Sequence, residues 1–132
     1  MFGTPPSRVD RPRRPGVLGP RERVLVVDDE PAVLRGLIRN LKDRYAVDTA
    51  DSAEHALLLL AAAEYRAVVT DYDLPGQDGI WLLEFVERRY PRVRRVLHSG
   101  SDPVEVDGYV KRGVVQTFLQ KPAHLGALES AV

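Results

Sequence analysis

Short apolar runs alternate with amphipathic segments along the chain from Arg23 onward. Residues 24–27 form a continuous apolar run, which is typical of a parallel strand buried on both faces. Pro31 suits the first turn of a helix, and apolar residues then recur at the spacing of one helical face: Leu34, Leu37, Ile38 and Leu41. This part of the chain therefore predicts a strand over residues 23–27 and a helix that begins near residue 31.

The same alternation recurs four more times. Further strands are predicted at residues 45–49, 66–71, 93–98 and 114–119. Ser52 is placed to cap the second helix, and Asp78 the third, which we expect to run to about Tyr90. The fourth helix is predicted over residues 104–111, and Pro122 opens a last helix that stops ten residues later. Five such units predict an α/β fold with a doubly wound, parallel five-stranded sheet and helices on both faces.

Polar side chains follow the predicted strands at the edge where ligands of such sheets bind. Asp28 and Asp29 follow the first strand, and Asp71 ends the third. Carboxylates brought this close repel one another unless a cation offsets their charge, and Mg²⁺ suits an all-oxygen site. Ser99 and Lys121 follow the last two strands and are suited to hydrogen-bond phosphoryl oxygens. The set predicts phosphoryl transfer with Asp71 as the nucleophile.

Four segments at these strand ends carry a resemblance to a known family. They are Val24-Leu25-Val26-Val27-Asp28-Asp29-Glu30-Pro31, Val68-Val69-Thr70-Asp71-Tyr72-Asp73-Leu74-Pro75-Gly76-Gln77-Asp78-Gly79, His98-Ser99-Gly100 and Phe118-Leu119-Gln120-Lys121-Pro122. Together and in this order they resemble the signature of response-regulator receiver domains, over about residues 23–132. The resemblance implies a flavodoxin-like receiver fold with strand order 2-1-3-4-5.

The resemblance also implies roles for individual residues. Asp71 would accept a phosphoryl group from a sensor histidine kinase or a phosphotransfer protein. Asp29 would bind Mg²⁺ directly, Asp28 mainly through water, and Asp71 and the backbone carbonyl of Asp73 would complete the ligands. Lys121 would pair first with the Asp71 carboxylate and then with the phosphoryl group. The only chemistry expected is Mg²⁺-dependent self-phosphorylation and autodephosphorylation, so the chain is not expected to be a substrate-turnover enzyme.

A switch is implied as well. Ser99 would move toward the new phosphoryl oxygen, and Phe118 would swing into the vacated space. The face formed by the fourth helix, fifth strand and fifth helix would then control an output domain or a partner protein, with dimerisation through the same face as a further outcome. An added dianion can bias such a two-state packing.

Several of these residues also have structural readings. Asp28 and Asp29 would cap the first helix, Asp78 the third, and Phe118 would be static core. His98 precedes Ser99 in a strand, so its side chain faces the other side of the sheet, where packing is the favoured role.

Two functional alternatives remain. One is a pseudo-receiver that docks proteins without being phosphorylated. The other is a phosphatase, because Asp71-Tyr72-Asp73 also resembles the D-x-D loop of haloacid-dehalogenase-type enzymes. That family places the motif after its first strand, whereas here it follows the third.

The composition limits the number of domains, the kinds of partner and the cellular locations that fit this chain. The 132 residues suit one domain, and 19 basic residues balance 19 acidic ones, which predicts no direct nucleic-acid contact. No apolar run is long enough for a membrane span, no secretory signal is present, and the lack of cysteine fits a cytoplasmic location. Residues 1–22 are rich in proline and arginine and are expected to form a flexible basic leader before the domain at 23–132, whose last helix is short.

Overall fold

The computed structural model describes residues 21–132, and most of the leader expected at 1–22 lies outside that range. The described residues form five strands and five helices in strict alternation. The strands are β1 (Arg23–Val27), β2 (Ala46–Ala50), β3 (Ala67–Thr70), β4 (Arg94–Ser99) and β5 (Thr117–Gln120), and the helices are α2 (Pro31–Leu41), α3 (Ala53–Ala62), α4 (Gly79–Arg89), α5 (Pro103–Lys111) and α6 (Leu125–Ala131).

All neighbouring strands are parallel, in the order β2-β1-β3-β4-β5. The predicted fold class and strand order are therefore confirmed. The strand order reverses beside β1, so β1 and β3 lie next to each other although a helix, a strand and another helix separate them in sequence. This is the position at which ligands bind in open α/β sheets.

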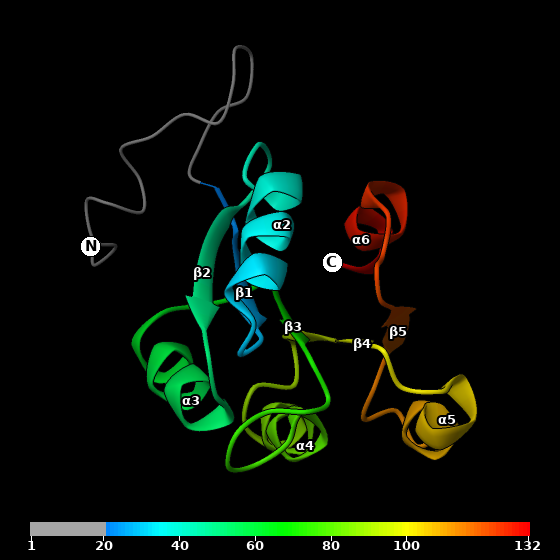
Figure 1. The fold of residues 1–132 in the computed structure, drawn as a ribbon. Coiled ribbons are helices and arrows are strands. Elements are labelled where there is room, and N and C mark those ends of the chain that lie inside the picture. The colour runs from blue at the N-terminus through cyan, green and yellow to red at the C-terminus, as the bar shows by residue number, and fades with distance from the viewer. Residues whose placement is uncertain (1–20) are drawn as a thin grey trace.

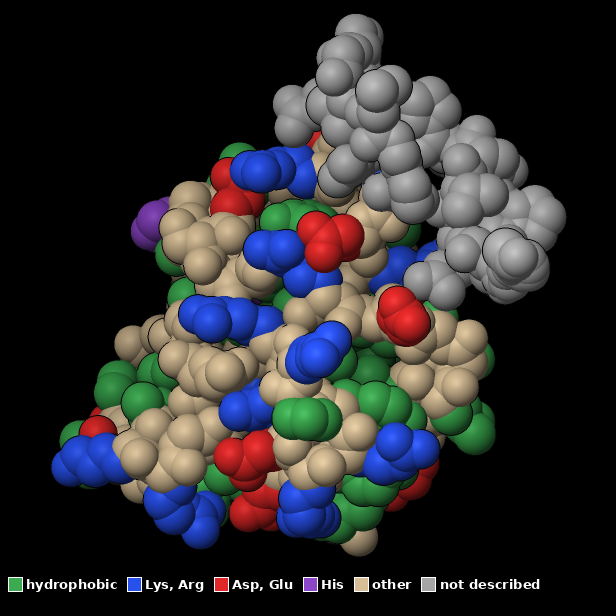
Figure 2. All heavy atoms as spheres, turned by 180° about the vertical axis from the view of Figure 1, so that it is seen from behind, with side chains coloured by type: hydrophobic (Ala, Val, Ile, Leu, Met, Phe, Trp, Pro, Cys, Tyr) green, Lys and Arg blue, Asp and Glu red, His purple; other side chains and the backbone are tan. Residues whose placement is uncertain are grey.

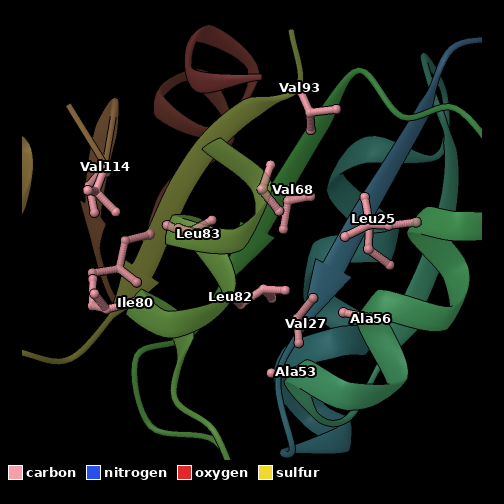
Figure 3. Close-up of a cluster of buried hydrophobic side chains, with 14 of the residues drawn as sticks. Leu25, Val27, Ala53, Ala56, Val68, Ile80, Leu82, Leu83, Val93 and Val114 are labelled. Atoms are coloured by element: carbon pink, nitrogen blue, oxygen red, sulfur yellow. The ribbon is translucent and has the colours of Figure 1, made fainter. Parts of the chain in front are cut away.

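Helices cover both faces of the sheet (Figure 1): α2 and α6 lie on one face and α3, α4 and α5 on the other. Alternate residues of β1 serve the two layers. Val24 and Val26 belong to the core under α2 and α6, whereas Leu25 and Val27 point toward Ala53 and Ala56 of α3 (Figure 3). The central strands read as continuous apolar runs because both of their faces are buried.

Two predicted boundaries are wrong by more than one residue. The fifth strand begins at Thr117 rather than at residue 114, because Val115 donates its N–H to the carbonyl of Tyr109 in the preceding helix, α5. Residues 114 and 115 are buried without belonging to the strand, so apolar character alone overestimated its length. The last helix begins at Leu125 rather than at Pro122, because the His124 imidazole accepts the Ala127 N–H and caps the helix there.

Two arginines hold the end of α6 against the amino ends of the strands. Arg66 donates through Nε to the Val132 carbonyl at 2.8 Å, and Arg94 donates to the Ala131 carbonyl at 3.0 Å. Helix C-terminal carbonyls carry partial negative charge, so the guanidinium groups suit this end. Ala131 and Val132 are buried, which shows that the short last helix still closes the core.

The outer surface is mixed in charge. Figure 2 shows the side turned away from the viewer in Figure 1, where Lys and Arg side chains are spread among acidic and apolar ones. Ion pairs such as Arg66–Glu22 and Arg44–Glu129 link neighbouring elements at the surface. No helix within residues 21–132 is long and apolar enough to cross a membrane.

Candidate functional site

Three aspartates from two neighbouring strands meet at the carboxyl edge of the sheet. Asp28 and Asp29 directly follow β1, and Asp71 directly follows β3. Each can offer a carboxylate oxygen such that the three oxygens lie within 4.8 Å of one another. Asp28 is 1% exposed and Asp71 7% exposed, whereas Asp29 is open to solvent. The predicted convergence of the carboxylates is thus present in the structure.

Lys121, the residue after β5, supplies the charge that offsets two of them. Its ammonium lies 2.9 Å from the Asp28 carboxylate and donates a 3.1 Å hydrogen bond to Asp71 Oδ2. Burial lowers the pKa of Lys121, but its hydrogen bonds to the two aspartates outweigh this effect, so the pKa lies above the usual 10.5. The lysine is therefore charged at neutral pH.

The loop after β3 fixes Asp71 from several sides. Asp71 Oδ1 accepts the Tyr72 N–H at 2.8 Å, and the Thr70 hydroxyl donates to the Asp71 carbonyl at 2.9 Å. Gly79 then donates its N–H to the Tyr72 carbonyl at 2.8 Å. The loop turns at Gly76, whose φ of 77° favours glycine. One carboxylate oxygen thus contacts a main-chain amide and the other an ammonium.

Helix capping, the alternative role considered for these aspartates, is present at Asp78 but not at Asp28 or Asp29. Asp78 does cap α4, because its side chain accepts the Trp81 N–H at 2.8 Å. Asp28 instead accepts the N–H of Glu30, the residue before α2, and no side chain caps that helix. Capping therefore leaves the position of Asp29 and the ion pair of Asp28 with Lys121 unexplained.

Ser99 ends β4 at the same edge and is 1% exposed. Its hydroxyl lies 3.0 Å from the Ser101 hydroxyl and accepts the Ser101 N–H at 3.3 Å. Phe118 of β5 packs, half-buried, against the core on the α3, α4 and α5 side. Ser99 and Phe118 lie on neighbouring strands of the sheet, β4 and β5, where Ser99 pairs with Gln120 and Phe118 with Leu97.

The pocket at this edge is open to solvent. It is lined by the loops after β1, β3, β4 and β5, and includes Asp29, Asp71, Asp73, Ser99 and Lys121. The Asp73 side chain is exposed and lies two residues beyond Asp71. All the predicted site residues except Asp28, which is buried beneath the pocket, and Phe118, which packs behind it, contribute to this lining.

His98 lies on the other face, as predicted. It lines a separate cleft beside Val33, Gly36 and Leu37 of α2. It is 5% exposed, and its Nδ1 is buried without a hydrogen-bond partner within the described chain. Burial lowers the pKa of His98 below the usual 6.5, and the charge of Lys121 lowers it further.

Three residues near the site were missed by the sequence analysis. Glu30 places a carboxylate oxygen 3.8 Å from the Lys121 ammonium, and Ser101 holds the Ser99 hydroxyl. Tyr72 adjoins Asp71, and burial together with a hydrogen bond to Tyr109 raises its pKa to about 12. Glu30 and Ser101 could have been found from their spacing, since each lies two residues beyond a predicted site residue.

The arrangement is suited to binding an anionic group such as a phosphoryl group and transferring it to a carboxylate. It offers one nearly buried carboxylate, a fixed ammonium, a hydroxyl and a further exposed aspartate around an open pocket. An incoming phosphoryl oxygen would meet donors from Lys121 and Ser99. Three carboxylate oxygens within 4.8 Å of one another also match the ligand preference of Mg²⁺.

Comparisons with known proteins agree with this geometry. The family model for the response regulator receiver domain matches residues 24–132. Response regulator protein PilR of Pseudomonas aeruginosa is 33% identical over 116 residues, which cover 85% of this chain and 25% of PilR. The chain thus spans about a quarter or less of the length of the curated relatives it matches.

Solved structures extend the comparison. A signal receiver domain of an HD domain-containing protein from Pseudomonas fluorescens is 31% identical with a TM-score of 0.76, covering 84% of this chain and 94% of that one. A response regulator protein from Burkholderia pseudomallei, solved with a phosphorylated aspartic acid, a calcium ion and citrate, is 25% identical with a TM-score of 0.76. That match covers 83% of this chain and 65% of the Burkholderia chain.

Proposed function

The chain belongs to the response regulator receiver domain family of two-component signalling, and we propose that Asp71 is its phosphoryl acceptor. The donor is a phosphohistidine on a sensor histidine kinase or a phosphotransfer protein. A carboxylate oxygen of Asp71 forms the new bond to phosphorus while the bond from phosphorus to the imidazole nitrogen breaks. The imidazole leaves and takes up a proton from the solvent, which completes the balance of the reaction.

The position of Asp71 carries this proposal. Its carboxylate has a main-chain donor and the Lys121 ammonium and also lines the open pocket. Asp28 has the same kinds of partner but is buried and does not line the pocket. The amide and the ammonium are placed to stabilise negative charge that spreads over the phosphoryl oxygens. The phosphorylated aspartic acid in the Burkholderia protein supports the same chemistry in a similar chain.

Receiver domains generally bind Mg²⁺ at an acidic pocket, and the carboxylates here fit that ion. Asp29 and Asp71 are the direct ligands in our proposal, Asp28 acts mainly through water, and the Asp73 carbonyl completes the set. When bound, Mg²⁺ offsets the repulsion between the carboxylates and the incoming phosphate. Lys121 orients the Asp71 carboxylate and then pairs with the phosphoryl group.

The output of the reaction is a change of packing. Ser99 gives up its contact with Ser101 to donate to the phosphoryl group, and Phe118 moves inward behind it. Both residues lie next to α5, so the face of α5, β5 and α6 changes with them. This face is the proposed contact for an output domain, an effector or a second copy of the chain. We place the reaction in the cytoplasm, because the ATP that supplies the phosphoryl group to a kinase is available there.

The alternatives have less support. A docking-only module would not need Lys121 and Asp71 to be joined at 3.1 Å in a pocket open to phosphate. A phosphatase of the D-x-D type would use Asp73 as acid and base, but that side chain makes no hydrogen bond within the described residues and follows the third strand. We therefore propose a switch that is phosphorylated once per signal and does not turn over a substrate.

Labelling with a small phosphodonor tests the function. With Mg²⁺ and acetyl phosphate, the chain should form an acid-stable, base-labile acyl phosphate that raises its intact mass by one phosphoryl group. Asp71→Asn should abolish the label, whereas Asp43→Asn, in an exposed loop at the other end of the sheet, should retain it. Full labelling of Asp71→Asn would refute the acceptor assignment. Continuous release of phosphate from an ester substrate would instead favour the phosphatase.

A further inference from the structure

Two tyrosines connect the acceptor loop to α5. We propose that Tyr72 and Tyr109 are positioning residues that restrain α5 and couple its position to the state of Asp71. The inference rests on the proposed function, because it concerns how phosphorylation of Asp71 is transmitted. It adds a route to α5 that does not pass through Ser99 or Phe118.

The first link joins Tyr72 to the acceptor. The Tyr72 N–H donates to Asp71 Oδ1 at 2.8 Å, and the Tyr72 carbonyl accepts the Gly79 N–H at the start of α4. Both main-chain polar groups of Tyr72 are therefore hydrogen-bonded, the N–H to Asp71 and the carbonyl to the first residue of α4. A phosphoryl group on the Asp71 carboxylate changes the charge and the space that the Tyr72 amide faces.

The second link is the contact between the rings. The Tyr72 and Tyr109 rings meet edge to face, with centroids 6.5 Å apart and planes at 70°. Tyr72 also packs against the hydrophobic core, and its hydroxyl interacts with that of Tyr109. Edge-to-face pairs add to the free energy of packing beyond the area that they bury. The ring of Tyr109 is thus held by a residue adjacent to the acceptor.

The third link ties Tyr109 to α4. Its ring lies under the Arg112 guanidinium at 5.2 Å, and Arg112 reaches Glu84 of α4 at 3.6 Å. Val106, one turn earlier on α5, is fully buried, whereas Val104 and Val110 are exposed. The inner face of α5 therefore has few apolar anchors, and the Tyr109 contacts form a large part of what holds its second half.

The direction of the coupling follows from Ser99. In the arrangement described, the Ser99 hydroxyl is engaged by Ser101, the residue before the cap of α5. The proposed switch ends that contact, so the tyrosine pair stabilises the arrangement that phosphorylation replaces. Weakening the pair should favour the other arrangement and make a phosphoryl mimic bind more tightly.

The test uses beryllium trifluoride with Mg²⁺ as the phosphoryl mimic on the full chain. Its dissociation constant and the α5 amide resonances are measured for the wild type, Tyr72→Leu, Tyr109→Leu and the double variant. Each single variant should bind the mimic about two- to tenfold more tightly. The α5 resonances of each free variant should lie partway toward their positions in the bound wild type. The double variant should change binding no more than the larger single effect, since one contact is removed in each case.

Tyr90→Leu is the matched control, because Tyr90 lies at the other end of α4 and packs on Phe85 and Arg89. If Tyr109→Leu does not fold, Arg112→Gln removes the outer anchor and should shift binding in the same direction by a smaller factor. Tyrosine variants that behave like Tyr90→Leu, or single effects that multiply in the double variant, would overturn the restraint. A wild type that fails to bind the mimic, or Asp71→Asn that binds it equally, would overturn the proposed function and the restraint together.

Discussion

Gly79 begins α4 directly against the main-chain carbonyl of Asp71, so closely that a methyl group on Gly79 would overlap the carbonyl oxygen. The start of α4 is therefore packed directly against Asp71. The loop between them, from Tyr72 to Asp78, turns back on itself to allow this approach. A hydrogen bond from the Gly79 N–H to the Tyr72 carbonyl closes the loop.

Gly79→Ala should therefore destabilise the fold and slow labelling. The added methyl group forces the β3–α4 loop away from its position, at a cost of about 1–3 kcal/mol in the free energy of unfolding. Urea denaturation measures the first effect and the labelling rate the second. Gly108→Ala in α5 is the control, because nothing lies within 4 Å of its added methyl group. That control should be neutral or stabilising, and a Gly79→Ala chain as stable as the wild type would contradict the prediction.

Replacing Lys121 by methionine should separate metal binding from phosphorylation. Without the ammonium, the Asp28 and Asp71 carboxylates attract Mg²⁺ more strongly, by about tenfold in affinity. In the absence of the ion, the buried charges left behind should lower the stability by about 1–3 kcal/mol. Labelling should nevertheless fall, because the group that orients Asp71 is gone.

Calorimetric titration with Mg²⁺ checks the change in affinity. Lys111→Met removes an exposed ammonium that pairs with Asp107 on α5, and it should leave both metal affinity and labelling unchanged. Weaker Mg²⁺ binding by the Lys121 variant would show that the lysine supports the metal site rather than competing with the ion.

His98 should make the stability depend on pH. Its pKa is lowered in the folded protein, so below about pH 6.5 the unfolded chain binds a proton there that the folded chain does not. Stability therefore falls as the pH drops below this value and levels off below the folded pKa. His98→Leu removes this contribution. Denaturation at pH 7.5 and pH 5.5 should show a smaller loss for the variant than for the wild type, and equal losses would rule out this role.

Ser99→Ala should uncouple labelling from the response of α5. Asp71 keeps its contacts with Tyr72 and Lys121 in this variant, so an acyl phosphate still forms. The hydroxyl that would follow the phosphoryl group is missing, so the changes in α5 amide resonances on adding beryllium trifluoride should shrink. Full-sized changes would show that the tyrosine pair alone transmits the signal, and Ser130→Ala, exposed on α6, serves as the control.

The site could be predicted to the extent that it depends on strand ends. Asp28, Asp71 and Lys121 each follow a strand, and parallel strands bring their carboxyl ends to one edge whatever the details of packing. Contacts between a loop and a helix were not accessible in this way. The pairing of Tyr72 with Tyr109 depends on how far α5 lies from the β3–α4 loop, which no local pattern encodes.

The predicted start of β5 was wrong because residues can be buried without pairing in a strand. Val114 and Val115 are as apolar as strand residues and are buried, yet they belong to the turn that leads from α5 into β5. Pro122 suits a helix start by its ring geometry, but the capping imidazole of His124 decides where α6 begins. In both places a hydrogen bond, rather than residue type, determines where the strand or helix begins.

Lys121 lies 50 positions beyond Asp71, and β5 has to pair with β4 before the two can meet. A nascent chain that has left the ribosome only as far as β4 therefore holds its aspartates without their lysine. The pair of Lys121 and Asp71, on which the proposed phosphorylation depends, therefore forms only with the last crossover of the sheet.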